Sequence, residues 1–140
     1  MLSLQLSAFA RDCFCMIVAL GVDIIEIARI EDAFARLGHR FRDRIFTESE
    51  IAYCESRGSR LASYAARFAA KEAVMKALGT GWGDRVRWRD IEVRRSETGV
   101  PSVVLTGRAL ERFREIGAAK AHLSLSHSRE IAMAQVVFES

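Results

Sequence analysis

Strand-like segments lie at both ends of this 140-residue chain, and helical patterns fill most of the region between them. Residues 17–22 form a short apolar run rich in β-branched side chains, and residues 121–126 and 131–138 have the pattern of a final hairpin. The longest helical pattern, about 61–78, is followed by Gly79, a residue type that commonly ends helices. A chain of this length supports one compact domain, so the pattern predicts a single α+β domain.

Four shorter features complete the predicted element order. They are a helix over 25–37, a short helix from Glu48, a strand pair over 91–95 and 102–106, and a helix over about 108–116. Thr-Glu-Ser-Glu before the short helix has the form of a capping box, in which the first and last residues satisfy each other's backbone N–H groups. The resulting order is one strand, three helices, two strands, one helix and two strands.

The first 15 residues differ from those that follow. Arg11 and Asp12 interrupt the apolar character that a secretory signal needs, and the strand-like run begins at Met16, which can serve as an initiator. We therefore expect residues 1–15 to be a peripheral N-terminal extension and residues 16–140 to form the domain.

Cysteine content and hydropathy limit the setting in which the chain works. Cys13, Cys15 and Cys54 are odd in number and lack the spacing of paired ligands, so neither a disulfide framework nor a structural zinc site is expected. This usage predicts a reducing, cytoplasmic location. No uninterrupted apolar run approaches the roughly 20 residues of a bilayer-spanning helix, so no membrane partner is expected.

Basic residues are concentrated in one part of the chain. The stretch from Arg57 to Arg89 carries a formal charge of +6, whereas the rest of the chain sums to −3. Such a concentration favours a poly-anionic ligand, namely nucleic acid, a nucleotide or a phosphorylated cofactor. A solvated basic face is the alternative interpretation.

Two carboxylates occupy positions where apolar residues are expected. Asp23 lies inside the apolar run MIVALGVDII, and Glu72 interrupts the apolar stripe of the long helix between Phe68 and Met75. A charge in such a place is unfavourable unless it is paired or ligated, and oxygen ligands favour a hard cation such as Mg²⁺ over zinc. Two alternatives stay open: Glu72 could pair with Lys76 four residues later, and Asp23 could cap the helix that follows it.

Basic residues lie near Glu72 in the sequence of the long helix. Arg67, Lys71 and Lys76 are predicted to surround it, an arrangement that suits phosphoryl transfer, where positioning and charge neutralisation supply most of the catalysis. The alternative is that these three residues only solvate the outer face of the helix. His127 follows the strand-like run 123–126, and a lone histidine there is either structural or functional.

Three segments together resemble one enzyme family. GVDIIEIARI (21–30), RFAAKEAVMKALGTG (67–81) and LSLSHS (123–128) are similar to segments of the holo-[acyl-carrier-protein] synthases, the small 4′-phosphopantetheinyl transferases, and the resemblance covers 16–138. It implies the 4′-phosphopantetheinyl transferase fold, a small, mainly antiparallel sheet packed with helices. It also implies a homotrimer with active sites at the subunit interfaces.

The resemblance implies a reaction and a set of residues for it. The enzyme would transfer 4′-phosphopantetheine from coenzyme A to a serine of apo acyl carrier protein, releasing adenosine 3′,5′-bisphosphate, and would support fatty acid biosynthesis. Asp23 and Glu72 match the Mg²⁺ ligands, and Lys76 matches the lysine that contacts the coenzyme A diphosphate. We expect Lys76 to stabilise developing charge, and Glu72 to take the serine proton directly or through a metal-bound water.

Further residues match the family's coenzyme A contacts. Arg67 corresponds to a contact with the 3′-phosphate, and His127 to a residue near the phosphates. Gly99 and Pro101 match a Gly-Lys-Pro element that borders the adenine from a neighbouring subunit, but the middle residue here is Val100. Any charge contact from that position is therefore in doubt, whereas the backbone shape is not.

The first helix of the family presents basic residues to the acidic carrier protein. Arg29 fits that pattern well, whereas Arg36 and Arg40 fit it loosely because the following loop varies in length. Arg29 and Arg36 are seven residues apart and share one face of a helix. Such groups would raise the association rate in a salt-sensitive way.

Two other classes of function compete with this interpretation. A small basic nucleic-acid-binding module would need stacking aromatics, which Trp82 and Trp88 could supply, but it would not explain Asp23 and Glu72. A non-catalytic, oligomeric nucleotide-binding protein could share the same pocket without performing transfer. We expect the enzyme, with no nucleic-acid partner.

Overall fold

A computed structural model describes residues 15–80 and 85–140. The elements in chain order are β1 (Ile17–Glu26), α1 (Ile27–Leu37), α2 (His39–Ile45), α3 (Glu48–Glu55), α4 (Arg60–Leu78), the short 3₁₀ turn η1 (Trp88–Asp90), β2 (Ile91–Arg95), β3 (Pro101–Leu105), α5 (Gly107–Glu115), β4 (Lys120–His127) and β5 (Ile131–Glu139). This order confirms the predicted α+β class. In the described part of the chain no helix is long and apolar enough to cross a membrane.

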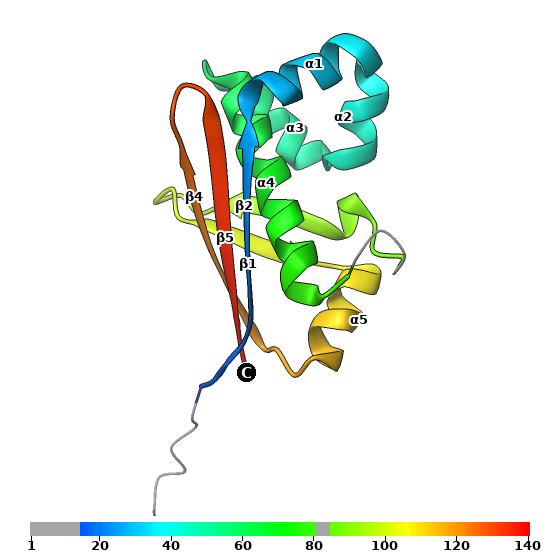
Figure 1. Cartoon of the computed structure of the whole chain (residues 1–140), viewed down its shortest axis with the longest axis vertical. Helices are drawn as coiled ribbons and strands as arrows, with labels where there is room; N and C mark the ends of the chain where they lie inside the picture. The colour runs from blue at the N-terminus through cyan, green and yellow to red at the C-terminus, as the bar shows by residue number, and fades with distance from the viewer. Residues whose placement is uncertain (1–14, 81–84) are drawn as a thin grey trace, which may run out of the picture.

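Two antiparallel sheets frame the long helix α4. β1, β5 and β4 form a three-stranded sheet in that spatial order, and β2 pairs with β3 as a separate hairpin. Figure 1 shows α4 running along the three-stranded sheet, with α1, α2 and α3 gathered at one end and α5 at the other. The β2–β3 hairpin crosses behind α4, so this helix lies between the two sheets.

The three-stranded sheet has one buried face and one exposed face. Side chains alternate along a strand, and in β5 Ala132, Ala134, Val136 and Phe138 are buried whereas Ile131 and Met133 are exposed. The outward positions of β1 are also large and apolar, because Leu20, Val22 and Ile24 all lie on the solvent side. The isolated chain therefore leaves an apolar sheet face uncovered, which is uncommon for a monomer.

Small residues let β1 and α4 approach each other closely. A Cβ atom added at Gly21 would fall on the carbonyl oxygen of Ala73. Ala69, Ala73 and Ala77 are buried along α4, and alanine favours the helix while adding little bulk to the contact. The helix ends at Gly79, whose left-handed backbone (φ 66°, ψ 23°) gives the C-terminal cap that the sequence predicts.

Several predicted boundaries are wrong, and each has a local cause. β1 continues past residue 22 to Glu26 because β5 pairs with it as far as Ile131, so α1 begins at Ile27 and not at residue 25. A fifth helix, α2, was not predicted, because its seven residues are too few to show a helical period. The short turn η1 was also missed. The extension expected over 1–15 lies outside the described residues, except for Cys15.

The capping box before α3 is confirmed. The Thr47 hydroxyl accepts a hydrogen bond from the Glu50 backbone N–H at 3.4 Å, and the Glu50 carboxylate accepts one from the Thr47 N–H at 2.9 Å. Glu50 is nevertheless buried, so its role goes beyond capping the start of α3.

The close approach at Gly21 predicts a specific loss of stability. Gly21→Ala forces backbone to move against backbone, and we expect it to lower the free energy of unfolding by about 2 kcal/mol or more. Gly58→Ala is a matched control because an added Cβ meets nothing within 4 Å there. Denaturant unfolding of both variants checks this, and equal effects of the two substitutions would contradict the packing argument.

Candidate active site

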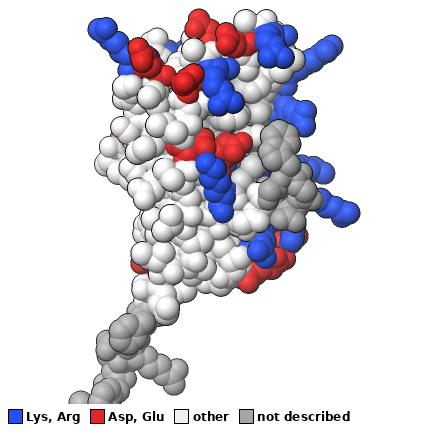
Figure 2. All heavy atoms as spheres, in the orientation of Figure 1, with Lys and Arg blue, Asp and Glu red and all other residues white. Residues whose placement is uncertain are grey.

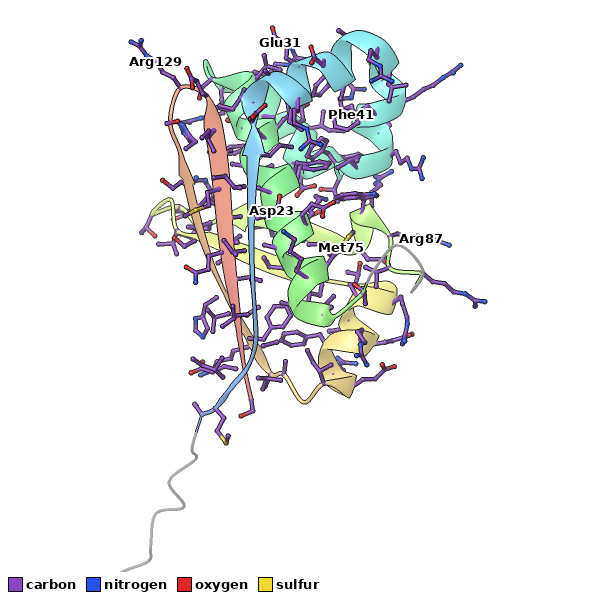
Figure 3. All side chains as sticks on the ribbon, in the orientation of Figure 1. Asp23, Glu31, Phe41, Met75, Arg87 and Arg129 are labelled. Atoms are coloured by element: carbon purple, nitrogen blue, oxygen red, sulfur yellow. The ribbon has the colours of Figure 1, made fainter. Side chains whose placement is uncertain are left out.

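β1 and α4 bring the two unexpected carboxylates together. Asp23 lies on β1 two residues beyond Gly21 and on the same face of the strand, and Glu72 precedes Ala73 on α4. Burial raises the pKa of Glu72, the negative charge of Asp23 raises it further, and Lys76 opposes both effects. The raised pKa is consistent with two carboxylates in one half-buried place. Figure 3 shows Asp23 of β1 beside α4, the helix that carries Met75.

Lys76 completes this group, but it pairs with Asp23. Its ammonium nitrogen lies 2.7 Å from Asp23 Oδ1 and donates a second hydrogen bond to the Val22 carbonyl at 3.0 Å. The pairing of Glu72 with Lys76 that the sequence left open is therefore not observed. The capping role for Asp23 is also wrong, because α1 begins after Glu26 and has no side-chain cap.

The two carboxylates offer oxygen atoms that the described protein leaves uncommitted. Glu72 makes no hydrogen bond or ion pair with any residue in 15–80 or 85–140, and Asp23 uses only Oδ1. No group of three or more His, Cys, Asp or Glu residues that could hold a metal ion occurs in those ranges. A cation here would have two protein carboxylates and would need other oxygen ligands, which suits the way Mg²⁺ binds substrate phosphates and water.

Glu72 and Lys76 open into a cavity of about 750 Å³, here called the Glu72 cleft. Its apolar lining comes from Met75, Val86 and Trp88. Its basic lining, besides Lys76, consists of Arg44, Arg85, Arg87 and Arg89. Figure 2 shows basic side chains gathered along the edge of this face over α2 and the segment leading into β2. Of the two carboxylates only Glu72 lines the cleft, and Asp90 lines it too, but basic residues predominate, which fits a phosphorylated ligand.

Arg67 lies in a different cavity, here called the Arg67 cleft. This space of about 780 Å³ is also lined by Thr47, Ser49, Tyr53, Glu92, Val93, Arg94, Arg95 and Ser96, and Arg89 lines both clefts. The Arg67 side chain is 2% exposed and its guanidinium lies 3.9 Å from the centre of the Tyr53 ring. Its Nε has no hydrogen-bond partner among the described residues. An anion in this cleft would supply one.

The three basic residues of α4 do not surround Glu72 as predicted. Successive helical residues turn by about 100°, so Arg67 and Lys76 lie on opposite sides of α4. Lys71 is fully buried between these two directions and pairs with Glu50 at 2.8 Å. The predicted cluster around Glu72 is therefore wrong for Arg67, which lies in the other cleft, and for Lys71, which is neither at the acidic pair nor on a solvated face.

The remaining coenzyme A contacts expected from the resemblance, His127, Gly99 and Pro101, line neither cleft. His127 ends β4 on the same sheet face as Asp23, but β5 lies between their strands, a separation of about 10 Å. Gly99 (φ 84°) lies in the β2–β3 turn with Pro101 close behind it. This turn joins the Arg67 cleft through Ser96, whose N–H donates to the Val100 carbonyl at 3.0 Å.

The residues expected to contact the carrier protein are exposed, and acidic residues, Glu31 and Asp32, also lie on α1. Arg29 and Arg36 lie on α1 and Arg40 lies at the start of α2, and all three side chains are exposed. Arg29 is near the end of β1 that carries Asp23. A protein docked on α1 would therefore lie close to the acidic pair.

Sequence reasoning missed several residues that shape the clefts. Arg44 and Trp88 belong to α2 and η1, which were not predicted as elements. Glu50 was recognised only as a capping residue. No local signal shows that its carboxylate also meets Lys71, 21 positions away.

Comparisons with known proteins identify related sequences and related folds. The profile of the 4′-phosphopantetheinyl transferase superfamily matches residues 19–135. The chain is 46% identical over 124 residues to the holo-[acyl-carrier-protein] synthase of Koribacter versatilis, covering 89% of this chain and 99% of that protein. Crystal structures of two such synthases superpose on it. That from Neisseria meningitidis has a TM-score of 0.82 at 33% identity and covers 89% of this chain and 100% of its own.

The second, from Helicobacter pylori, was solved in complex with coenzyme A. Its TM-score is 0.74 at 34% identity, and the match covers 85% of this chain and 98% of that one. The profile match and the identity to the curated relative both extend over most of the chain. The chain therefore belongs to the 4′-phosphopantetheinyl transferase superfamily.

Proposed function

We propose that this protein is a holo-[acyl-carrier-protein] synthase. It transfers 4′-phosphopantetheine from coenzyme A to a serine hydroxyl of apo acyl carrier protein and releases adenosine 3′,5′-bisphosphate. The observation that carries the proposal is the meeting of Asp23 and Glu72 beside Lys76 at the edge of a basic cleft. Phosphoryl transfer requires these groups, because catalysis depends on positioning and on neutralising phosphate charge.

Asp23 and Glu72 are suited to hold a divalent cation, and Mg²⁺ is the ion we propose. Carboxylate oxygens are hard ligands, and Mg²⁺ is commonly bound through one or two carboxylates plus substrate phosphates. When bound, the cation neutralises diphosphate oxygens. In the absence of the ion, Lys76 pairs with Asp23. Its ammonium group therefore already lies next to the place where the negative charge of the diphosphate must be balanced.

The protein groups supply the proton transfer and the electrostatics of the reaction. The serine oxygen forms a bond to the phosphorus atom that carries pantetheine, and the bridging bond to the adenosine-side phosphate breaks with its electron pair. Glu72 takes the serine proton directly or through water. Lys76 stabilises the negative charge on the phosphates.

The two clefts are neighbours, because Arg89 lines both, and we propose that one coenzyme A occupies them together. We assign its diphosphate to Lys76 in the Glu72 cleft and its 3′-phosphate to Arg67 in the other, with His127 near the phosphates. The unsatisfied Nε of Arg67 supports this assignment. Gly99 and Pro101 border the adenine of a neighbouring subunit, and Val100 gives that contact no charge.

The competing functions fit the geometry less well. Trp88 stacks on Phe68 with ring centres 5.0 Å apart, so it forms a wall of the Glu72 cleft and is not free to stack on a base. Trp82 lies outside the described residues. A nucleotide-binding protein without catalysis would have no use for two adjacent carboxylates beside the phosphate site, since they repel phosphate unless a cation joins them.

The transfer reaction gives the first test. Incubation of the chain with coenzyme A, Mg²⁺ and apo carrier protein should add one phosphopantetheinyl group to the carrier, measured by intact mass. Asp23→Asn and Glu72→Gln should each lower kcat/KM by about 100-fold or more, because each removes a cation ligand and the second also removes the base.

Glu111→Gln makes the same chemical change at an exposed position of α5 and should leave the rate unchanged. All variants should keep the wild-type circular dichroism spectrum. Wild-type turnover by either site variant would remove the metal assignment, and no mass gain with the wild-type chain would overturn the proposed function.

The exposed arginines Arg29, Arg36 and Arg40 are the proposed docking contacts for the carrier protein. Arg29→Ala should raise KM for carrier protein about two- to fivefold, as expected for one exposed charge pair, and leave KM for coenzyme A unchanged. The effect should shrink at high salt. Arg114→Ala, on the last turn of α5, is the control. Equal increases in both KM values would show that Arg29 does not dock the carrier.

We propose that two further copies of this chain cover the exposed face of the three-stranded sheet, giving a homotrimer with active sites at the subunit interfaces. Leu20 and Ile24 are 61% and 60% exposed on this face. Charged side chains are sparse over the part of the molecule where the sheet lies (Figure 2). An apolar surface of this kind is typical of contacts between subunits.

Charge placed on the sheet face should break the assembly. Light scattering should give about three times the chain mass of 15.7 kDa for the wild type, and Leu20→Glu should reduce it to one chain. Leu37→Glu, a matched change at an exposed leucine of α1, should leave the mass unchanged. A wild-type monomer would contradict the proposal.

The cellular location of the reaction is inferred from the cysteines. We place the enzyme in the cytoplasm, where its free thiols Cys15 and Cys54 stay reduced. Fatty acid biosynthesis is the process that it supports there.

A further inference from the structure

Lys71 and Glu50 form an ion pair that is completely buried between the two clefts. Both side chains are 0% exposed, and the Lys71 ammonium lies 2.8 Å from Glu50 Oε2. The ammonium also donates to the carbonyls of Ile45, Trp88 and Ile91 at 2.8, 3.1 and 2.6 Å. The lysine therefore holds the end of α2, the turn η1 and the start of β2 at one point.

The Glu50 carboxylate holds a second set of backbone groups. Its Oε2 accepts a hydrogen bond from the Thr47 N–H at 2.9 Å, and its Oε1 accepts one from the Val93 N–H at 2.8 Å. Thr47 is the cap of α3 and Val93 lies in the middle of β2. One carboxylate thus joins two segments that lie 46 residues apart in the chain.

These partners are parts of the walls of both clefts. Trp88 lines the Glu72 cleft, and Ile45 directly follows Arg44, which lines the same cleft. Thr47 and Val93 line the Arg67 cleft. The pair therefore connects the two cavities through backbone hydrogen bonds.

A gain in folding stability does not by itself explain why this ion pair is present. Taking two charges out of water is costly, and apolar side chains of similar volume often stabilise a core as well or better. The ion pair instead fixes directions, because each of its atoms is hydrogen-bonded to a particular backbone group. Such a network is well suited to hold two surfaces at one separation.

We propose that Lys71 and Glu50 are positioning residues that fix the spacing between the Glu72 cleft and the Arg67 cleft. The inference rests on the proposed function, in which coenzyme A occupies both clefts at once. For a ligand with two linked ends, the second end binds with an effective concentration that depends on the match between the ligand's span and the two sites. The pair acts on affinity through this match and does not touch the substrate.

Binding of coenzyme A and of its two fragments tests the proposal. The double variant Lys71→Met/Glu50→Gln removes both charges together, so no unpaired charge stays buried. We expect its Kd for coenzyme A, measured by calorimetry with Mg²⁺, to rise about tenfold or more. The Kd values for adenosine 3′-monophosphate and for 4′-phosphopantetheine should each change by less than about threefold, because the first carries only the phosphate assigned to the Arg67 cleft and the second only the phosphate assigned to the Glu72 cleft.

A stability-matched control separates this effect from general loosening. Phe113→Leu disturbs the contact with Phe138 at the α5 end of the core, where the ring centres are 4.8 Å apart. It should lower Tm while leaving all three Kd values within twofold. If the double variant is unfolded, Lys71→Gln/Glu50→Gln takes its place in the same titrations, because it also removes both charges and keeps amide groups that can hydrogen-bond the surrounding backbone.

Two outcomes would overturn the inference. One is wild-type affinity for coenzyme A in the folded variant, and the other is a loss no larger than the combined losses for the two fragments. Failure of the proposed function is recognised separately, because the wild-type chain would then transfer nothing to apo carrier protein. A wild-type enzyme that transfers, combined with a variant of unchanged coenzyme A affinity, would remove the positioning role alone.

Discussion

The close contact between β1 and α4 is the constraint on which the site depends. Gly21 has no side chain, so the strand lies against the backbone of α4 at Ala73. This approach places Asp23, two residues along the strand, next to Glu72, one residue back along the helix. Packing between small residues therefore creates an electrostatic problem, since two carboxylates are brought together where burial already disfavours charge. Lys76 offsets part of it by pairing with Asp23.

The functional side chains of α4 point in three different directions. Glu72 and Lys76 face one cleft, Arg67 faces the other, and Lys71 points between them into the core. One helix can do this because its side chains turn by about 100° per residue. The walls opposite α4 come from segments distant in sequence, and the buried pair of Lys71 and Glu50 joins those segments. The positions of the phosphate-binding groups are thus set by backbone packing and by one polar network.

The sequence predicted most of the fold and the acidic pair, and its errors have physical causes. The α+β class, the long helix and the capping box follow from local periodicity and capping chemistry, which a sequence displays directly. Asp23 and Glu72 were recognisable because each interrupts an apolar pattern. The burial of Lys71 was not recognisable. The sequence of a helix does not show whether a lysine is solvated or pairs with a carboxylate from a distant segment. The end of β1 depended likewise on pairing with β5, 105 residues later.

The central claim is that Asp23 and Glu72 hold one divalent cation at the phosphates of coenzyme A. Crystals grown with Mn²⁺ and coenzyme A, with data collected near the manganese absorption edge, locate that ion directly by anomalous scattering. The account predicts a peak shared by the two carboxylates and within bonding distance of a diphosphate oxygen. A peak bound elsewhere, or coenzyme A seated in the clefts with no ion between these carboxylates, would contradict it.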